Sequence, residues 1–262
     1  MFLKADISTL LFYAKSRVEA RRELAIRLYY GFNAPDDEKE AKIQCEKAKN
    51  AGDKIAKAFW FFQGWNDRFR ATDYKAAFRL CQDKECVDHP QIQVIIGWIH
   101  SSGQIGPENK QEALHWYLKA ATEHNYALAQ ANLASIYKKD PKTVDKALEL
   151  YKKASAQGHL CATLPLANLL EEKGLYKEAC EYYIKLFVLQ NELALKAQTA
   201  FINLIKTNKI AWSPEYHRLW PELPQFKSTI VLLMWIKKVD SKIKLPRPLY
   251  YEIIRNLFDI LK

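Results

Sequence analysis

Glycine and proline are scarce in this 262-residue chain, which contains 8 Gly and 10 Pro. A β-sandwich or β-barrel needs many tight turns and more of both residues, so the composition argues against these folds. The chain contains five cysteines, an odd number and few for its length. This argues against a disulfide framework and indicates a reducing compartment. No run of 18 apolar residues is present, so we expect no transmembrane segment.

A polybasic run is also absent, although the chain has a net charge of +10. No stretch contains more than two consecutive Lys or Arg residues. Residues 209–262 contain 10 basic and 5 acidic side chains, so half of the excess lies in about a fifth of the chain. A basic excess directs attention to nucleic acid, anionic membranes or acidic proteins as partners.

An alanine-centred pattern repeats along the chain and predicts the fold. The anchoring alanines recur at intervals of 36, 36, 34 and 32 residues, and they are Ala41, Ala77, Ala113, Ala147 and Ala179. Four residues after each alanine, on the same helical face, lie Cys45, Cys81, Tyr117, Tyr151 and Tyr183. A period in the thirties with one such helix per unit is typical of stacked helical hairpins.

The motif resembles the Sel-one-like repeat, a variant of the tetratricopeptide repeat. The matching residues are Ile96–Gly97, Gly103, Glu112–Ala113, Trp116–Tyr117, Lys119–Ala120–Ala121 and Gln157–Gly158–His159. The resemblance covers about residues 20–190 and implies a right-handed α-solenoid of about five stacked hairpins with helical caps at both ends. We therefore expect an all-α chain.

Three parts are expected along the chain. Residues 1–20 form an N-terminal capping helix, 21–192 the repeat array, and 193–262 a C-terminal helical cap with a degenerate sixth repeat as an open alternative. An open solenoid needs its last core face covered, which is the role expected of the two end segments.

Trp60 and Trp65 are the first candidate partner-binding residues. They lie in and just after the run Phe59–Phe62, whose four consecutive side chains point to every side of a helix. We favour burial of these rings between neighbouring units. Anchors in a concave groove for a protein or peptide are the alternative.

The C-terminal segment supplies two further candidate sites. A basic cluster beside Trp235 provides a surface for nucleic acid or anionic lipid, and it comprises Lys237, Lys238, Lys242, Lys244 and Arg247. An apolar series resembles the opening of an F-box, the docking motif of ubiquitin-ligase adaptors, and it comprises Leu245, Pro246, Leu249, Ile253 and Leu257. The alternative is an amphipathic capping helix with proline near its start.

Histidine and cysteine positions do not form a catalytic or metal motif. His89 and His159 both lie twelve residues after an anchoring alanine, where we expect the turn between units. Cys81 and Cys86 lack the spacing of a structural zinc site. No phosphate-binding loop or nucleophile motif is found, so we expect neither a cofactor, a metal nor catalytic residues.

The sequence therefore predicts a non-catalytic scaffold or adaptor that presents a concave surface to a protein or peptide. Lys4 and Asp6 interrupt the apolar N-terminus, which argues against a cleavable signal peptide and favours a cytoplasmic location. Some bacterial proteins with this repeat enter host cells, so the resemblance also implies a secreted effector translocated without a cleavable signal peptide.

Overall fold

The structure is a computed structural model that describes residues 5–32, 37–65, 73–187, 189 and 192–207. Within these ranges it contains twelve α-helices and no β-strand, which confirms the predicted all-α fold. In chain order the helices are α1 (Ile7–Tyr13), α2 (Val18–Tyr30), α3 (Glu38–Asn50), α4 (Lys54–Phe62), α5 (Tyr74–Cys81), α6 (Pro90–Ser102), α7 (Lys110–Glu123), α8 (Ala127–Tyr137), α9 (Val144–Ala156), α10 (Leu160–Glu172), α11 (Tyr176–Leu186) and α12 (Glu192–Lys206).

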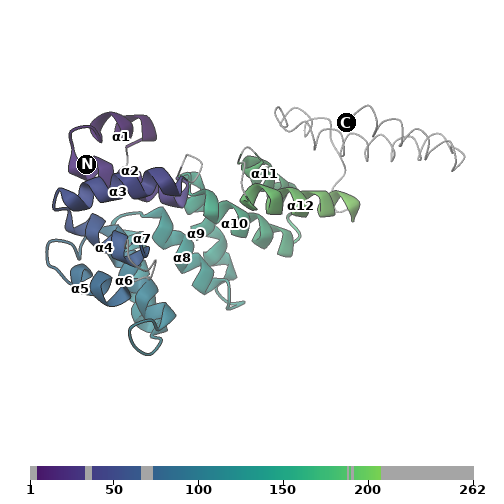
Figure 1. Cartoon of the computed structure of the whole chain (residues 1–262). Helices are drawn as coiled ribbons and strands as arrows, with labels where there is room; N and C mark the ends of the chain where they lie inside the picture. The colour runs from purple at the N-terminus through teal and green to yellow at the C-terminus, as the bar shows by residue number, and fades with distance from the viewer. Residues whose placement is uncertain (1–4, 33–36, 66–72, 188, 190–191, 208–262) are drawn as a thin grey trace, which may run out of the picture.

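Consecutive helices pack in pairs, and the pairs stack into a curved array (Figure 1). The five hairpins are α2–α3, α4–α5, α6–α7, α8–α9 and α10–α11, in agreement with the predicted number of units. Each hairpin contacts the next through the second helix of one and the first helix of the other. Stacked hairpins of this kind bury a continuous core that no single unit could form alone.

One helix flanks the hairpins at each end of the described array. The N-terminal helix α1 packs on α2, which begins at Val18, three residues before the boundary that we expected. At the other end α12 contacts both α11 and α10, much as α8 contacts both α7 and α6. The helix α12 therefore occupies the place of a first helix in a sixth hairpin.

The repeat register accounts for the core. All five anchoring alanines are fully buried, and the residues one turn later are at most 4% exposed. Seven residues after the alanine, Ala48, Ala120, Ala154 and Leu186 are also fully buried, whereas Lys84 is exposed. The exception follows from the short second unit, because α5 ends at Cys81 and Lys84 lies beyond its last turn.

Short polar side chains begin several of these helices. Asp37, Asp53, Asp73 and Asn109 each accept a hydrogen bond from the backbone N–H three residues ahead, at 2.7–3.1 Å. Such caps satisfy a donor that the first helical turn leaves unpaired, and each stabilises its helix by about 1 kcal/mol. The chain therefore marks its helix starts locally.

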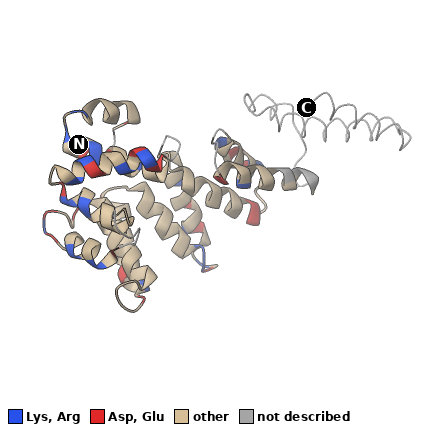
Figure 2. Cartoon of the chain, viewed as in Figure 1, with Lys and Arg blue, Asp and Glu red and all other residues tan. Residues whose placement is uncertain are grey.

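Charges on the described surface are mixed in sign, with basic and acidic residues interspersed along the helices (Figure 2). Several ion pairs join one repeat to the next, including Lys138–Glu172 at 2.8 Å and Lys152–Glu178 at 3.1 Å. Exposed pairs of this kind contribute about 0–1 kcal/mol each. Much of the positive charge in the array is therefore balanced locally.

Gly97 allows the closest helix approach of the third hairpin. A Cβ atom at this position would lie 2.7 Å from Cε1 of Tyr117, whose side chain is only 3% exposed. The first helices of other hairpins also carry a small, fully buried residue, namely Ala25 in α2, Ala134 in α8 and Ala167 in α10. A ring on the second helix of the hairpin thus fills the space that a missing side chain leaves on the first.

We expect Gly97→Ala to lower the free energy of unfolding by about 1 kcal/mol. Overpacking against Tyr117 costs about 1–3 kcal/mol and exceeds the helix-propensity gain of about 1 kcal/mol. Urea denaturation measures the change. Gly106→Ala is the matched control, because an added Cβ there meets no atom within 4 Å. Equal stability of the Gly97→Ala protein and the wild type would contradict this account of the crossing.

Candidate functional site

Trp60 and Trp65 are buried, with exposed fractions of 2% and 5%. Their ring centroids are 5.6 Å apart, and Trp65 makes edge contacts with Phe59 and Tyr29 at 5.6 and 5.5 Å. The ammonium of Lys49 lies 3.9 Å from the centroid of the Trp60 ring. The structure therefore gives these tryptophans a packing role between hairpins, and their role as partner anchors stays a prediction.

The C-terminal candidates lie outside the described residues. This applies to the basic cluster Lys237, Lys238, Lys242, Lys244 and Arg247, and to the apolar series Leu245, Pro246, Leu249, Ile253 and Leu257. Their proposed contacts with nucleic acid, anionic lipid or ubiquitin-ligase components stay predictions.

His89 and His159 lie at the turns between units, as the register predicted. Each is the N-cap residue of the following helix, α6 or α10. The Nδ1 atom of His89 accepts a hydrogen bond from the Gln91 backbone N–H at 3.3 Å, whereas the side chain of His159 makes no capping bond. His159 is instead only 3% exposed, because another part of the array covers it.

The end of α2 covers His159. We call the side of the array on which α2 faces the starts of α8 and α10 the inner face. Gly31 ends α2 in the left-handed conformation, with φ 65°, and the chain then turns so that Phe32 leaves the helix axis. The Phe32 ring stacks on His159 with centroids 4.6 Å apart and planes at 14°, and their backbones form an isolated bridge. The Cys161 thiol donates to the Tyr30 carbonyl at 3.7 Å. We call the contacts of residues 30–32 with residues 159–161 the clasp.

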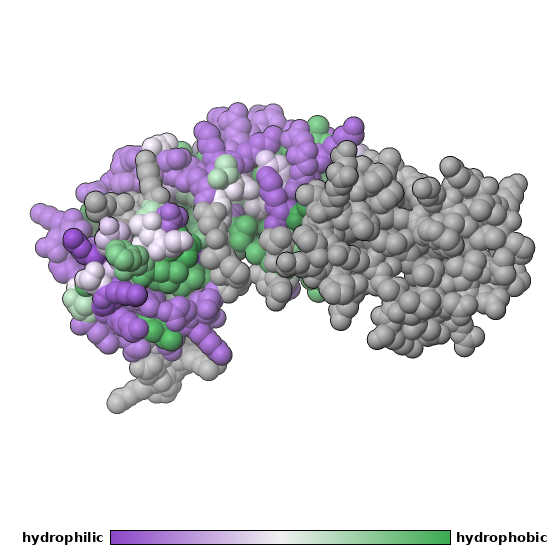
Figure 3. All heavy atoms as spheres, turned by 90° about the horizontal axis from the view of Figure 1, so that it is seen from above, coloured by the Kyte–Doolittle hydropathy of each residue, from purple (hydrophilic) through white to green (hydrophobic). Residues whose placement is uncertain are grey.

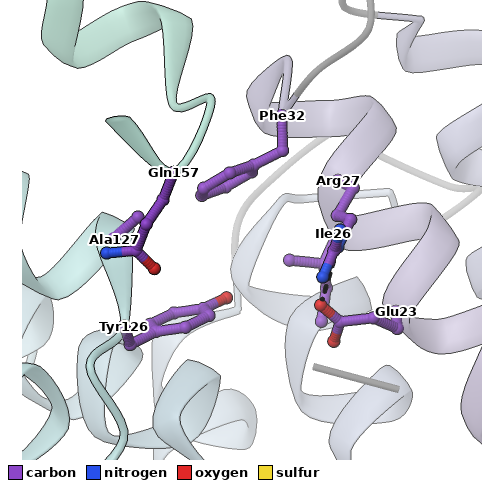
Figure 4. A pocket seen from close by; sticks show the side chains of 7 residues that line it. All are labelled: Glu23, Ile26, Arg27, Phe32, Tyr126, Ala127 and Gln157. Carbon is purple, nitrogen blue, oxygen red and sulfur yellow. Dashed lines mark hydrogen bonds and ion pairs between the residues drawn. The ribbon is translucent and has the colours of Figure 1, made fainter. Parts of the chain in front are cut away.

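Beside the clasp lies a cavity of about 50 Å³. One side is formed by α2 and by Phe32, two residues beyond its end, and the other by the start of α8 and the C-cap of α9 (Figure 4). Its lining residues are Glu23, Ile26, Arg27, Phe32, Tyr126, Ala127 and Gln157. One water occupies about 10–15 Å³ on such a scale, so the cavity has room for one small polar group.

Glu23 and Arg27 make one wall of the cavity ionic. Glu23 is 3% exposed, and its Oε1 accepts a hydrogen bond from Nε of Arg27 at 3.1 Å. Burial raises the pKa of Glu23 above its usual range, while the positive charge of Arg27 acts in the opposite direction. Arg27 also donates to the backbone carbonyl of Ala5. A buried pair of this kind is costly to break, because either partner would be left as an unpaired charge.

Neutral hydrogen bonds continue from the cavity in two separate groups. Tyr126 donates its hydroxyl to Oε1 of Gln91 at 2.8 Å. Gln157 donates to Gln130 at 2.8 Å, and Gln130 donates to Asn125 at 2.6 Å. These side chains are therefore held in fixed positions by two successive hairpins, α6–α7 and α8–α9.

The sequence contained only a faint signal for this cavity. Glu23 and Arg27 are spaced four residues apart, which is also the spacing of ordinary exposed helix pairs. They face Tyr126 and Gln157 of the fourth hairpin across the cavity, so residues distant in sequence complete their surroundings. Among the described residues, no group of three His, Cys, Asp or Glu side chains is arranged to bind a metal ion. Within the same ranges, no helix is long and apolar enough to cross a bilayer.

The clasp predicts a loss of stability in acid. Burial lowers the pKa of His159 from 6.5 to about 4. As the pH falls from about 6.5 to about 4, the unfolded chain binds a proton at this residue that the folded chain does not, so the free energy of unfolding falls by roughly 3 kcal/mol. We expect His159→Gln to lose less stability than the wild type between neutral pH and about pH 4.5, measured by urea denaturation.

Two comparisons frame this pH experiment. His115→Gln changes an exposed histidine of α7 and should retain the pH dependence of the wild type. An equally steep acid loss in His159→Gln would contradict the assignment. His89 makes a separate contribution in every variant, since burial lowers its pKa to about 3.

No family model and no curated protein matches the chain. Among solved structures, it is similar to a protective antigen of uropathogenic Escherichia coli that displays an SLR fold, with 18% identity and a TM-score of 0.45 over 96% of this chain. The chain spans 59% of that protein's length. It is also similar to a Sel1 repeat protein from Oxalobacter formigenes, with 16% identity and a TM-score of 0.43 over 76% of this chain and 93% of the other. The repeat assignment rests on the register of buried alanines and the five packed hairpins described above.

Proposed function

We propose that the protein is a non-catalytic interaction scaffold that binds a protein or peptide segment on its inner face. The observation that carries this proposal is the cavity between α2 and the α8–α9 hairpin, where an ionic pair, a hydroxyl and an amide surround space for one small polar group. A partner side chain entering this space would meet hydrogen-bonding groups that are already positioned, which lowers the entropic cost of binding.

The stacked fold supports the same proposal. Helical repeat arrays provide extended surfaces built from successive units, and function on such folds depends on the residues displayed. Here Gln157 lines the cavity and is held by its hydrogen bond to the buried Gln130. The Gln157 amide can hydrogen bond to a peptide backbone or to a polar side chain that enters the cavity.

Ala127→Leu tests the proposal by filling the cavity. Ala127 lines the cavity at the start of α8 and is 3% exposed. We expect the variant to remain folded and to recover partners at least tenfold less efficiently than the wild type in affinity purification from the source cell. Loss of the anchoring pocket would account for that decrease.

Ala156→Leu is the matched control, since Ala156 is an exposed residue of α9 next to the cavity-lining Gln157. Hydrogen exchange on the purified complex provides a second measurement, with protection expected over residues 23–32 and 126–130. Unchanged partner recovery by Ala127→Leu, with protection confined to the outer helices, would contradict binding on the inner face.

A further inference from the structure

The N-terminal cap presents apolar side chains outward. Leu10 of α1 is fully buried against α2, but the next three residues are exposed: Leu11 by 51%, Phe12 by 69% and Tyr13 by 40%. Three of the six large exposed hydrophobic residues in the described chain are thus consecutive, and Phe12 and Tyr13 are in edge contact at 5.1 Å. We call Leu11–Tyr13 the apolar tip. An apolar area is visible at the α1 end of the surface (Figure 3).

An outward apolar tip is unexpected for a solenoid cap. Terminal units ordinarily carry a polar outer face, because nothing further stacks on them. The packing of α1 explains Leu10 and Ala14, which face α2 in a small separate core. It does not require Leu11 or Phe12 to be apolar, since neither is buried in that core.

Basic side chains surround the same end of α1. Lys15 and Arg17 follow the helix directly, and both are exposed. Arg21 of α2 folds back onto the α1 terminus, where it donates to the carbonyls of Ala14 at 2.5 Å and Lys15 at 2.9 Å. Three cations therefore lie beside the apolar tip.

Acidic side chains do not balance this end of α1 fully. Asp6 lies at the opposite end of α1, where its side chain accepts from the Thr9 backbone N–H. Glu19 is an exposed acidic residue close in sequence to the three cations. The tip is therefore apolar with a basic rim.

The exposed area of the apolar tip distinguishes between a second copy of this chain and a lipid surface as its partner. A fully uncovered aromatic side chain exposes about 150–250 Å². At the observed fractions, the three residues together present roughly 300 Å². A standard protein interface buries about 800 Å² on each partner, so the tip is too small to hold a second copy of this chain by itself. A lipid surface needs no such area, because a few Leu, Phe and Tyr side chains enter the headgroup region while nearby Lys and Arg contact anionic lipids.

We propose that the apolar tip docks the protein onto an anionic lipid surface. Leu11 and Phe12 enter the boundary between headgroups and acyl chains, Tyr13 lies at headgroup level, and Lys15, Arg17 and Arg21 face the anionic headgroups. The inner face of the array then remains available to a protein partner, so this inference goes beyond the scaffold function and does not depend on it.

Vesicle flotation of the full chain tests the proposal. We expect binding to phosphatidylcholine vesicles that contain phosphatidylserine, and much weaker binding to phosphatidylcholine alone. Leu11→Ser combined with Phe12→Ser should reduce binding by about tenfold or more through lost apolar insertion. Lys15→Gln and Arg17→Gln should each reduce it by about fivefold, the contribution of one basic residue near an anionic surface.

Ile43→Ser is the matched control, because Ile43 is a comparably exposed apolar residue, at 44%, that belongs to α3 and not to the tip. It should bind as the wild type does. Binding within twofold of the wild type by the Leu11→Ser, Phe12→Ser protein would overturn the proposal, as would equal binding to both vesicle types. A wild-type dimer in sedimentation that this double variant converts to a monomer would also overturn it, by identifying a second copy as the occupant.

Discussion

Close approach of the two helices in each hairpin is the constraint on which this molecule depends. A buried alanine on the second helix faces the first, and Gly97 leaves its own helix without a side chain where the Tyr117 ring lies. Protein interiors are densely packed, so one methyl group at such a crossing displaces its neighbours. Every larger feature follows from hairpins that pack this closely, including the contact between units distant in sequence.

That distant contact gives the inner face its chemistry. Repeats of one motif would present similar surfaces, but the first hairpin differs from the others in having Phe32 just after its left-handed glycine and an ionic pair on α2. The turn before α10 supplies His159 opposite them. The cavity is therefore a product of two dissimilar units brought together, and the apolar tip lies on a separate surface at the α1 end.

Local patterns predicted the fold well, whereas the site depended on non-local geometry. Ala113 and Tyr117 revealed their burial through spacing alone, and His89 revealed a turn between units, because both effects act within one or two turns. Glu23 and Arg27 gave no comparable signal, since the residues that face them across the cavity belong to the fourth hairpin. The exposure of Phe12 likewise depends on how α1 lies on α2, which no periodicity in seven residues can specify.

The clasp also changes how the chain should lose structure. In an open repeat array, contacts are local and unfolding proceeds from the ends one unit at a time. The contact between Cys161 and Tyr30 spans 131 residues, so it ties the first hairpin to the fifth. The units between them then form a closed loop, and no hairpin within that loop is a free end. Residues 18–172 are expected to unfold as one cooperative block, at the cost of a slower search for the long-range contact during folding.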